Sequence, residues 1–268
     1  MRRSRSLAAA AAALVAALVA ALALAGAASA SPADRYVALG DSYSSGVGAG
    51  DYTDESGDCD RSPHAYSALY ATAVAPASYV SVACSGATTG DVDATQLSAL
   101  SADTSLVSIT IGGNDVGFSD IMTTCVLYGE SDCIAAVDSA EASARANLPG
   151  WLDTTYSGIT THAPNARVVV LGYPVFYDLS VSGCIGLSDA SRAKIDEGIG
   201  LVDGIIADRA GAHGFAYGDV TPNFAGHQIC DGDSWLHSLN WLDIGESYHP
   251  TAAGQADGYY PAFAALAG

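Results

Sequence analysis

The feature that most constrains the fold is an alternation of short apolar runs with longer segments of helical character. The runs are rich in β-branched residues and cover residues 35–39, 79–83, 106–111, 167–171 and 214–217. Runs that are apolar on both faces are typical of interior strands of a parallel sheet. Helical segments cover residues 62–73, 89–99, 134–161, 188–212 and 252–266. The alternation predicts an α/β fold, a three-layer α/β/α sandwich around a five-stranded parallel sheet.

Three residues of types that are used in catalysis come shortly after the first three apolar runs. Ser42 follows the first run, Gly86 the second and Asn114 the third. In an open parallel sheet the functional loops lie outside the carboxyl ends of the strands. We therefore expect these residues at one edge of the sheet. His249, in the loop before the last helical segment, can fold back to the same edge.

These residue types suit nucleophilic catalysis. A serine hydroxyl becomes a good nucleophile when a base such as His249 takes its proton. The backbone N–H groups of Ser42 and Gly86 and the side-chain amide of Asn114 would form an oxyanion hole. Each residue also has an ordinary structural explanation: a helix N-cap for Ser42, a turn glycine for Gly86 and an Asx-turn for Asn114.

The chain has six histidines, and His249 differs from the others in its two C-terminal neighbours. Pro250 and Thr251 predict a fixed entry from a loop into a helix. The other histidines lie in surface-like or helical contexts, where we expect structural or incidental roles: His64, His162, His213, His227 and His237.

The motifs around these four residues occur in a characteristic order. They are Gly40-Asp41-Ser42-Tyr43-Ser44-Ser45-Gly46, Cys84-Ser85-Gly86-Ala87-Thr88, Gly112-Gly113-Asn114-Asp115 and Glu246-Ser247-Tyr248-His249-Pro250. The ordered Ser, Gly, Asn and His resemble the SGNH (or GDSL) hydrolases, and the first stretch is similar to secreted actinomycete lipases and phospholipases A1. The resemblance covers nearly all of the chain after residue 30. It implies a flavodoxin-like sandwich, serine esterase activity, and no metal or cofactor.

A catalytic histidine also needs an acceptor for its Nδ1 proton. In much of the family that this chain resembles, an acid three residues before the histidine has this role, and Glu246 occupies that position. The resemblance to the secreted relatives implies instead the backbone carbonyl two residues before, which here is that of Ser247. The surrounding Ser-Tyr-His-Pro favours the Ser247 carbonyl, with Glu246 as the alternative.

Six cysteines occur after the first thirty residues: Cys59, Cys84, Cys125, Cys133, Cys184 and Cys230. An even number in an exported protein predicts disulfides, and no Cys-x-x-Cys occurs that would favour zinc. Pairing in sequence order closes the smallest loops. The resemblance implies the same three pairs, Cys59–Cys84, Cys125–Cys133 and Cys184–Cys230.

Residues 1–30 have the pattern of a signal peptide. Arg2, Arg3 and Arg5 precede an alanine-rich apolar run that ends in the small-residue site Ala28-Ser29-Ala30. A membrane anchor is the alternative for a run of this length. The cleavage site favours secretion to the outside of the cell. The rest, residues 31–268, then forms a single domain of ordinary size, with no repeat or linker.

The charge balance restricts the partners. The chain has 29 acidic residues, all after residue 30, against 10 basic residues, and its net charge is −19. A basic footprint for nucleic acid is absent, and anionic surfaces would repel the protein. We expect a monomer that takes a small-molecule or lipid ester and touches a lipid surface only transiently.

The sequence therefore predicts a secreted serine esterase that hydrolyses lipid esters through an acyl-enzyme on Ser42. The alternatives are a carbohydrate acetylesterase and a catalytically silent extracellular binding protein. A group of apolar residues shortly before His249 either lines an acyl groove or packs its loop onto the sheet: Trp235, Leu236, Trp241, Leu242 and Ile244.

Overall fold

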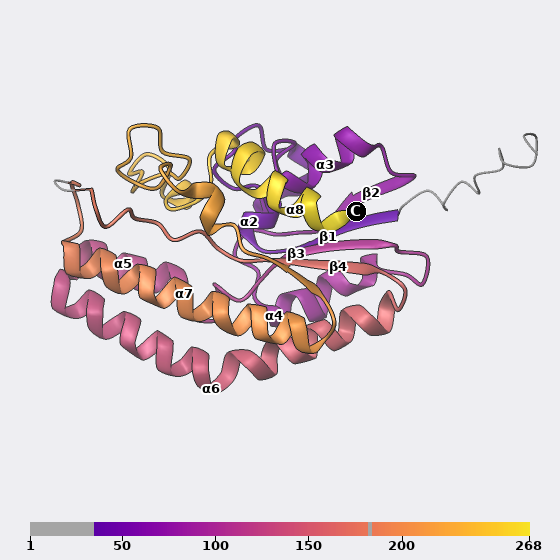
Figure 1. Cartoon of the computed structure of the whole chain (residues 1–268), viewed down its shortest axis with the longest axis horizontal. Coiled ribbons are helices and arrows are strands. Elements are labelled where there is room, and N and C mark those ends of the chain that lie inside the picture. The colour runs from indigo at the N-terminus through magenta and orange to yellow at the C-terminus, as the bar shows by residue number, and fades with distance from the viewer. Residues whose placement is uncertain (1–34, 182–183) are drawn as a thin grey trace, which may run out of the picture. The chain divides into compact units, whose positions relative to one another are not determined.

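A computed structural model describes residues 35–181 and 184–268; the predicted signal peptide of residues 1–30 lies outside the described residues. Within these ranges five strands form one parallel sheet in the order β2-β1-β3-β4-β5 (Figure 1). Their bounds are β1 Arg35–Gly40, β2 Ser78–Ser81, β3 Leu106–Thr110, β4 Arg167–Leu171 and β5 Ala216–Gly218. All five apolar runs thus become strands, with ends shifted by up to two residues.

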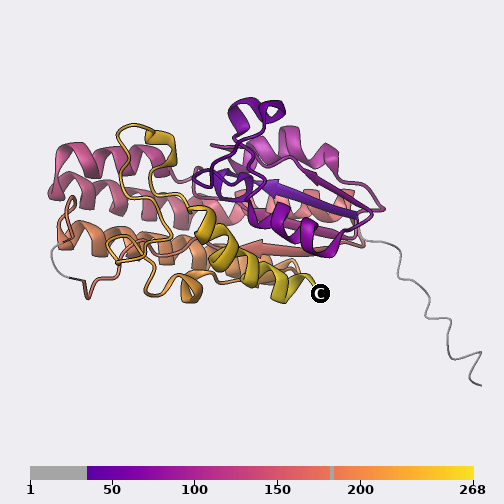
Figure 2. The ribbon, with the colours of Figure 1, turned by 90° about the horizontal axis from the view of Figure 1, so that it is seen from above.

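Helices lie on both faces of this sheet (Figures 1 and 2). On one face are α3 and α8, and on the other are α4, α6 and α7, with α5 packed beside α6. This arrangement confirms the predicted three-layer α/β/α sandwich. The helices are α2 Ser42–Ser45, α3 Tyr66–Val74, α4 Thr89–Asp91, α5 Phe118–Tyr128, α6 Glu130–His162, α7 Asp189–Ala212 and α8 Tyr260–Ala267.

Two predicted helices begin elsewhere: the one expected over residues 62–73 begins only at Tyr66, as α3, and the one expected over 134–161 begins earlier, at Glu130, as α6. The segment predicted as a helix over residues 89–99 is helical throughout, but α4 continues as a π-helical turn (Val92–Gln96) and a 3-10 turn (Leu97–Ala99). The segment predicted over residues 252–266 is likewise helical, and it contains a π-helical turn, Gly254–Tyr259, directly before α8. Helix α5 was not predicted at all. It is short and bounded by Gly117 and Gly129, both with positive φ, and such glycines in a sequence favour a loop.

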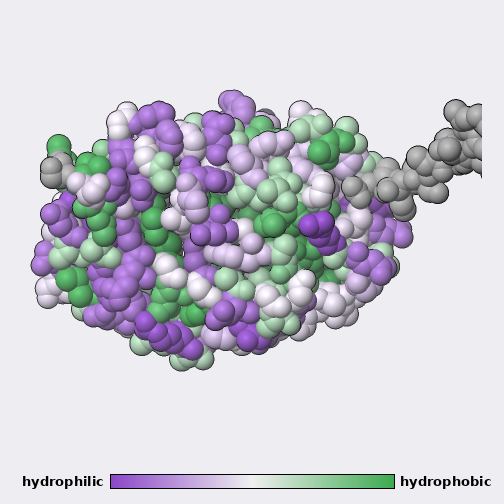
Figure 3. All heavy atoms as spheres, viewed as in Figure 1, coloured by the Kyte–Doolittle hydropathy of each residue, from purple (hydrophilic) through white to green (hydrophobic). Residues whose placement is uncertain are grey.

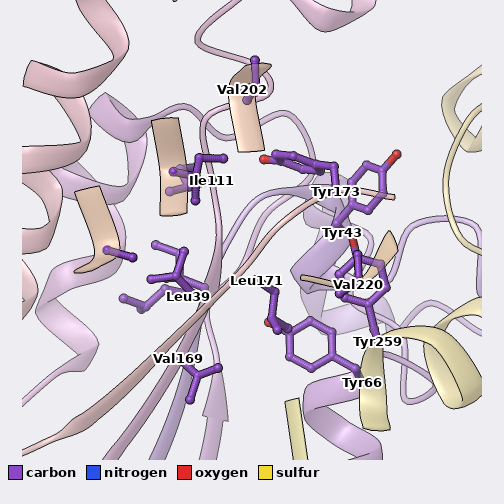
Figure 4. Close-up of a cluster of buried hydrophobic side chains, with 14 of the residues drawn as sticks. Leu39, Tyr43, Tyr66, Ile111, Val169, Leu171, Tyr173, Val202, Val220 and Tyr259 are labelled. Atoms are coloured by element: carbon purple, nitrogen blue, oxygen red, sulfur yellow. The ribbon is translucent and has the colours of Figure 1, made fainter. Parts of the chain in front are cut away.

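The hydrophobic core fills the space on both sides of the sheet (Figure 4). Leu39, Ile111 and Val202 lie on one side of the strands, and Tyr66 and Tyr259 lie on the other. All except Val202 are almost completely buried. Complete burial of one such aliphatic or aromatic side chain stabilises the fold by about 1.5–3 kcal/mol. This two-sided packing fixes the sheet edge at which the functional loops meet.

Disulfides join segments that the sheet alone would leave free. The pairs are Cys59–Cys84, Cys125–Cys133 and Cys184–Cys230, the pairs that the resemblance implied. The second links α5 to the start of α6, and the first anchors the turn that contains Gly86. Each such bond typically contributes about 2–4 kcal/mol, mainly by restricting the unfolded chain.

None of the helices in the described part of the chain is both long enough and apolar enough to span a membrane.

Candidate active site

Ser42 is the first residue of α2, immediately after β1. The helix cap is its neighbour Asp41, whose side chain accepts the backbone N–H of Tyr43 over 3.0 Å. Ser42 is therefore not the N-cap residue that a lone serine after a strand would suggest. Its hydroxyl instead donates to Nε2 of His249 over 2.7 Å. The structure brings together two residues that are 207 positions apart in the sequence.

The other ring nitrogen of His249 has a backbone partner. Nδ1 lies 3.0 Å from the carbonyl oxygen of Ser247, so the hydrogen-bond network assigns the proton to Nδ1. The carboxylate of Glu246 points elsewhere and accepts the hydroxyl of Tyr52 over 2.7 Å. Of the two acceptors considered from the sequence, the Ser247 carbonyl is the one in contact with the ring.

His249 is only 9% exposed, and this burial sets its protonation state. Desolvation disfavours the charged imidazolium and lowers the pKa of His249 to about 4, with His237 adding a smaller repulsion. The hydrogen bond to Ser247 opposes this shift in the pKa but does not overcome it. At neutral pH the ring is uncharged, and Nε2 is free to take a proton from Ser42.

The segments that carry Gly86 and Asn114 converge beside Ser42. The backbone N–H of Cys84 donates to the carbonyl of Gly40 over 3.0 Å, which brings the turn with Gly86 next to the turn with Ser42. Asn114 donates one amide hydrogen to the carbonyl of Ala87 over 2.9 Å. Within the described residues, the backbone N–H groups of Ser42 and Gly86 have no hydrogen-bond acceptor. Together with the second amide hydrogen of Asn114, they are available to an incoming oxyanion.

Two side chains brace these loops against each other. The carboxylate of Asp115 accepts both the backbone N–H and the hydroxyl of Thr89, which holds the loop after β3 to the start of α4. The hydroxyl of Tyr173 donates to Asp41 over 2.5 Å and accepts the backbone N–H of Gly113 over 3.1 Å. Tyr173 thus connects the turn before Ser42 with the loop that carries Asn114.

The sequence did not predict that Tyr173 belongs to the site, and it did not predict a separate role for Asp41. Tyr173 follows β4, so the rule that located Ser42, Gly86 and Asn114 at strand ends also applies to it. In Figure 4, Tyr173 lies beside Tyr43 near the ends of the strands. Burial raises the pKa of Asp41 to about 6, against the hydrogen bonds from Tyr173, Thr110 and Tyr43.

A narrow apolar pocket opens beside Ser42. Ser42, Gly113 and Asn114 line it together with apolar side chains of the loop after β3 and of α5, α6 and α7, among them Val116, Phe118, Met122, Ala140, Ile195 and Val202. Glu141 also reaches this pocket, but Nζ of Lys194 lies 3.0 Å from its carboxylate. The lining of the pocket suits an apolar chain.

A second apolar groove is lined by His249 itself, by α5 and by part of the loop that precedes His249, and it shares Phe118 and Met122 with the first pocket. Trp241 and Ile244 line this groove and are 70% and 61% exposed. Trp235 packs against Phe224 and His227, and Leu236 is buried. Trp241 and Ile244 therefore line a groove, which was one interpretation of this segment. Trp235 and Leu236 pack the loop onto the rest of the fold, which was the other.

The remaining histidines contact other partners. His237 hydrogen-bonds the carbonyl of Gly48, His64 bonds Asp51, and His213 bonds Asp153. His162 and His227 bond the backbone carbonyls of Gly158 and Asp233. Among the described histidines, His249 is the one that bonds Ser42.

A parallel α/β/α sandwich with a hydrogen-bonded serine and neutral histidine at its carboxyl edge has the arrangement of a serine hydrolase. The sequence matches a model of the GDSL-like lipase/acylhydrolase family over residues 38–256. The chain belongs to this family, and it is a carboxylic ester hydrolase.

Its relatives include Lipase 1 of Streptomyces coelicolor, which is 57% identical over 88% of this chain and 87% of that protein. Among solved structures, phospholipase A1 from Streptomyces albidoflavus superposes with a TM-score of 0.86 at 56% identity, over 88% of this chain and all of that one. An extracellular lipase from Streptomyces rimosus gives 0.86 at 52% identity, over 87% and 100% of the two chains.

Proposed function

We propose that this protein hydrolyses lipid esters with Ser42 as nucleophile and His249 as base. The observation that carries the proposal is the 2.7 Å hydrogen bond from Ser42 to a buried, neutral His249 at the mouth of an apolar pocket. Oγ of Ser42 bonds to the ester carbon as its proton passes to Nε2 of His249. Nδ1 stays bonded to the Ser247 carbonyl, which holds the ring in the orientation that the transfer needs.

The negative charge that develops on the carbonyl oxygen meets the N–H groups of Ser42 and Gly86 and the amide of Asn114. Removing one donor of this kind typically costs about 2.7–4 kcal/mol of transition-state stabilisation. The intermediate then breaks its bond to the alcohol oxygen, which receives the proton from His249. Water, activated by the same histidine, releases the acid from Ser42.

The pocket beside Ser42 supports a lipid acyl chain as the substrate's acid half. A chain of methylenes gains about 0.8 kcal/mol for each CH₂ that it buries. An acetyl group would leave most of this apolar pocket unfilled, which argues against the carbohydrate acetylesterase. The names of the relatives, lipase and phospholipase A1, agree with a lipid ester.

We also propose that the protein is exported, with residues 1–30 as its signal peptide and residues 31–268 as the single mature domain. Its disulfides are typical of oxidising compartments, and the Streptomyces rimosus relative is an extracellular lipase. The acidic composition supports a monomer that does not bind nucleic acid and meets lipid surfaces transiently.

The proposal is tested by kcat/KM on p-nitrophenyl esters from acetate to decanoate. We expect kcat/KM to rise with chain length and the Ala140→Leu variant, which fills part of the pocket, to shift the optimum to shorter acids. A wild-type preference for acetate would favour the acetylesterase. No turnover of any ester, with no labelling by a fluorophosphonate, would favour the silent binding protein.

A further inference from the structure

We propose that Tyr43 is a positioning residue that fixes His249 against Ser42, and that it does so through the backbone of Tyr248. This inference rests on the proposed function, since it concerns how the nucleophile and the base of the same reaction are held together. Tyr43 directly follows Ser42 in α2. Any contact that it makes with the loop of the histidine therefore ties the two halves of the pair to each other.

The hydroxyl of Tyr43 is hydrogen-bonded to the loop that carries the histidine. Hydrophilic side chains are spread over the face shown in Figure 3, where water can satisfy them. Tyr43 is instead 4% exposed, and its hydroxyl donates to the carbonyl of Tyr248 over 2.6 Å. Burial raises the pKa of Tyr43 well above its ordinary value of 10.0, so the hydroxyl stays protonated and able to donate. This bond holds the carbonyl of the residue directly before His249.

The ring of Tyr43 reaches the histidine itself. Its centroid lies 5.1 Å from that of the His249 imidazole, with the two planes tilted by 41°. The same ring packs edge-on against Tyr173 at a centroid distance of 5.0 Å, and Figure 4 shows the two tyrosines next to each other. Tyr173 is in turn bonded to Asp41, in the turn before Ser42. The imidazole thus packs against a ring that is held from the side of the nucleophile.

Tyr248 has a backbone conformation that a tyrosine rarely adopts. Its φ is +66°, in the left-handed region, where a Cβ atom comes too close to a backbone carbonyl oxygen. Such a conformation persists only where the surrounding structure imposes it. The N–H of Tyr248 donates to the carbonyl of His237 over 3.0 Å, and its ring stacks on Phe176 with the centroids 5.6 Å apart. The bond from Tyr43 holds the remaining polar group of this peptide segment, the carbonyl.

The left-handed turn at Tyr248 determines where the preceding carbonyl points. The carbonyl of Ser247 lies 3.0 Å from Nδ1 of His249, two residues later, and the chain turns at Tyr248 between them. A backbone carbonyl has no side-chain torsion with which to adjust its direction, so the dihedral angles of this turn set its aim. Tyr43 therefore acts on the base indirectly, because its hydroxyl helps to hold the turn that aims the Ser247 carbonyl at the ring.

The first test compares Tyr43→Phe with Tyr36→Phe. Both variants keep an aromatic ring and remove a buried hydroxyl, which in Tyr36 bonds Ser108 in the sheet over 2.7 Å. Tyr43→Phe leaves the Tyr248 carbonyl without this donor, so we expect kcat on a soluble ester to fall by about tenfold or more. KM should change little, because the phenyl ring still lines the pocket. Tyr36→Phe should lower the melting temperature by a similar amount and keep the wild-type kcat.

The NMR signal of the Nδ1 proton of His249 reports the position of the ring separately from the rate. A buried imidazole proton that is bonded to a carbonyl exchanges slowly with water and resonates downfield of the backbone amides. The signal is assigned by its absence from His249→Ala. We expect a sharp signal in the wild-type protein and in Tyr36→Phe. In Tyr43→Phe the signal should broaden or disappear at the same pH, because the turn then opens more often.

A second pair of variants tests the turn itself. Tyr248→Gly and Tyr248→Ala both lose the ring, but only alanine has a Cβ atom that makes a positive φ costly. Glycine adopts this φ freely, so kcat of Tyr248→Gly should exceed that of Tyr248→Ala by about fivefold or more. An alanine variant as active as the glycine variant would overturn the role of the left-handed turn.

The outcomes for Tyr43 separate the inference from the proposed function. A kcat in Tyr43→Phe within about twofold of wild type, or equal losses of kcat in Tyr43→Phe and Tyr36→Phe, would overturn the inference and leave the proposed function intact. An unchanged Nδ1 signal in Tyr43→Phe would overturn it in the same way. A wild-type protein that cleaves no soluble ester, with an Nδ1 signal that still depends on Tyr43, would support the positioning and contradict the proposed function.

Discussion

The imidazole of His249 has a backbone carbonyl, not a carboxylate, next to its Nδ1 atom. Glu246, three residues earlier, directs its carboxylate to Tyr52, which in turn accepts the backbone N–H of Gly48. This interaction ties Glu246 to the turn after α2. The orientation of the ring therefore depends on the path of the backbone through residues 246–249, which a substitution of the Glu246 side chain alters little.

Glu246→Gln should accordingly lower kcat by less than about tenfold, because glutamine can keep a hydrogen bond to Tyr52. Ser247→Ala, which retains the backbone acceptor, is the matched control and should stay active. A loss of about a thousandfold in Glu246→Gln with an unchanged melting temperature would establish a Ser-His-Glu triad, by analogy with the loss of a buried triad carboxylate.

The low pKa of His249 has a consequence for the pH profile. In the proposed mechanism the free base of His249 is the reactive form, and burial lowers the pKa of this ring to about 4. We expect the acidic limb of kcat/KM for a soluble ester to have its midpoint near pH 4, well below the usual range of histidine. Asp41 also titrates on the acidic side of neutral pH, because its pKa is raised to about 6. The measurement is therefore repeated in Asp41→Asn, which lacks this second titration. A midpoint near 6.5 that persists in Asp41→Asn would mean that His249 is not desolvated.

Between elements, the important contacts join the ends of strands. β1, β2 and β3 deliver Ser42, Gly86 and Asn114, and the loop after β4 delivers the residue that braces them. Tyr173 makes one hydrogen bond to each of two of these loops. Its hydroxyl lies between the turn before Ser42, the proposed nucleophile, and the loop that carries Asn114, a proposed oxyanion donor.

Tyr173→Phe should therefore lower kcat about tenfold while changing KM little. The variant leaves the carboxylate of Asp41 and the backbone N–H of Gly113 without this partner, and a hydrogen bond to a charged group is typically worth about 1.5–3 kcal/mol. Tyr79→Phe is the matched control, since Tyr79 bonds Ser67 on the far side of β1. Equal losses of kcat in the two variants would show that Tyr173 acts only through general stability.

The sequence predicted the elements that local residue patterns determine. It did not predict the features that depend on packing between segments far apart in the chain. Buried runs identified all five strands, and the strand-end rule brought Ser42, Gly86 and Asn114 to one edge. The apolar pocket beside Ser42 was not predicted, because Val116, Ala140 and Val202 come together only when α5, α6 and α7 pack. For the acceptor of the Nδ1 proton of His249, the sequence favoured the Ser247 carbonyl and left Glu246 as the alternative. Only the geometry of the turn shows that the Ser247 carbonyl lies next to the ring.

Across the folded chain, buried carboxyl groups link stability to pH. Burial raises the pKa of Asp196 to about 7 and that of Asp203 to about 8, above their value of about 3.8 when unfolded. The native state then binds more protons than the unfolded state between about pH 4 and 8, so stability falls as the pH rises through that range. His249, whose pKa is lowered, has the opposite effect only below about pH 6.5.

The melting temperature should therefore decrease from pH 6.5 to pH 8.5, measured with the disulfides intact. Asp203→Asn removes one of the two titrating groups and keeps an acceptor for the backbone N–H of Tyr173. It should flatten the decrease. A melting temperature that rises over this interval would contradict the raised pKa values of these buried carboxyl groups.

The reaction of the protein with a fluorophosphonate tests the Ser42–His249 pair most directly. The reagent bonds covalently to a serine only when a base activates its hydroxyl and an oxyanion hole holds the phosphoryl oxygen. We predict a single label, located by peptide mapping on Ser42, with ester hydrolysis lost in step with labelling. Ser42→Ala should neither label nor turn over, while keeping the melting temperature of the wild-type protein. A label on another residue, or hydrolysis that persists in Ser42→Ala, would contradict the assignment of the nucleophile.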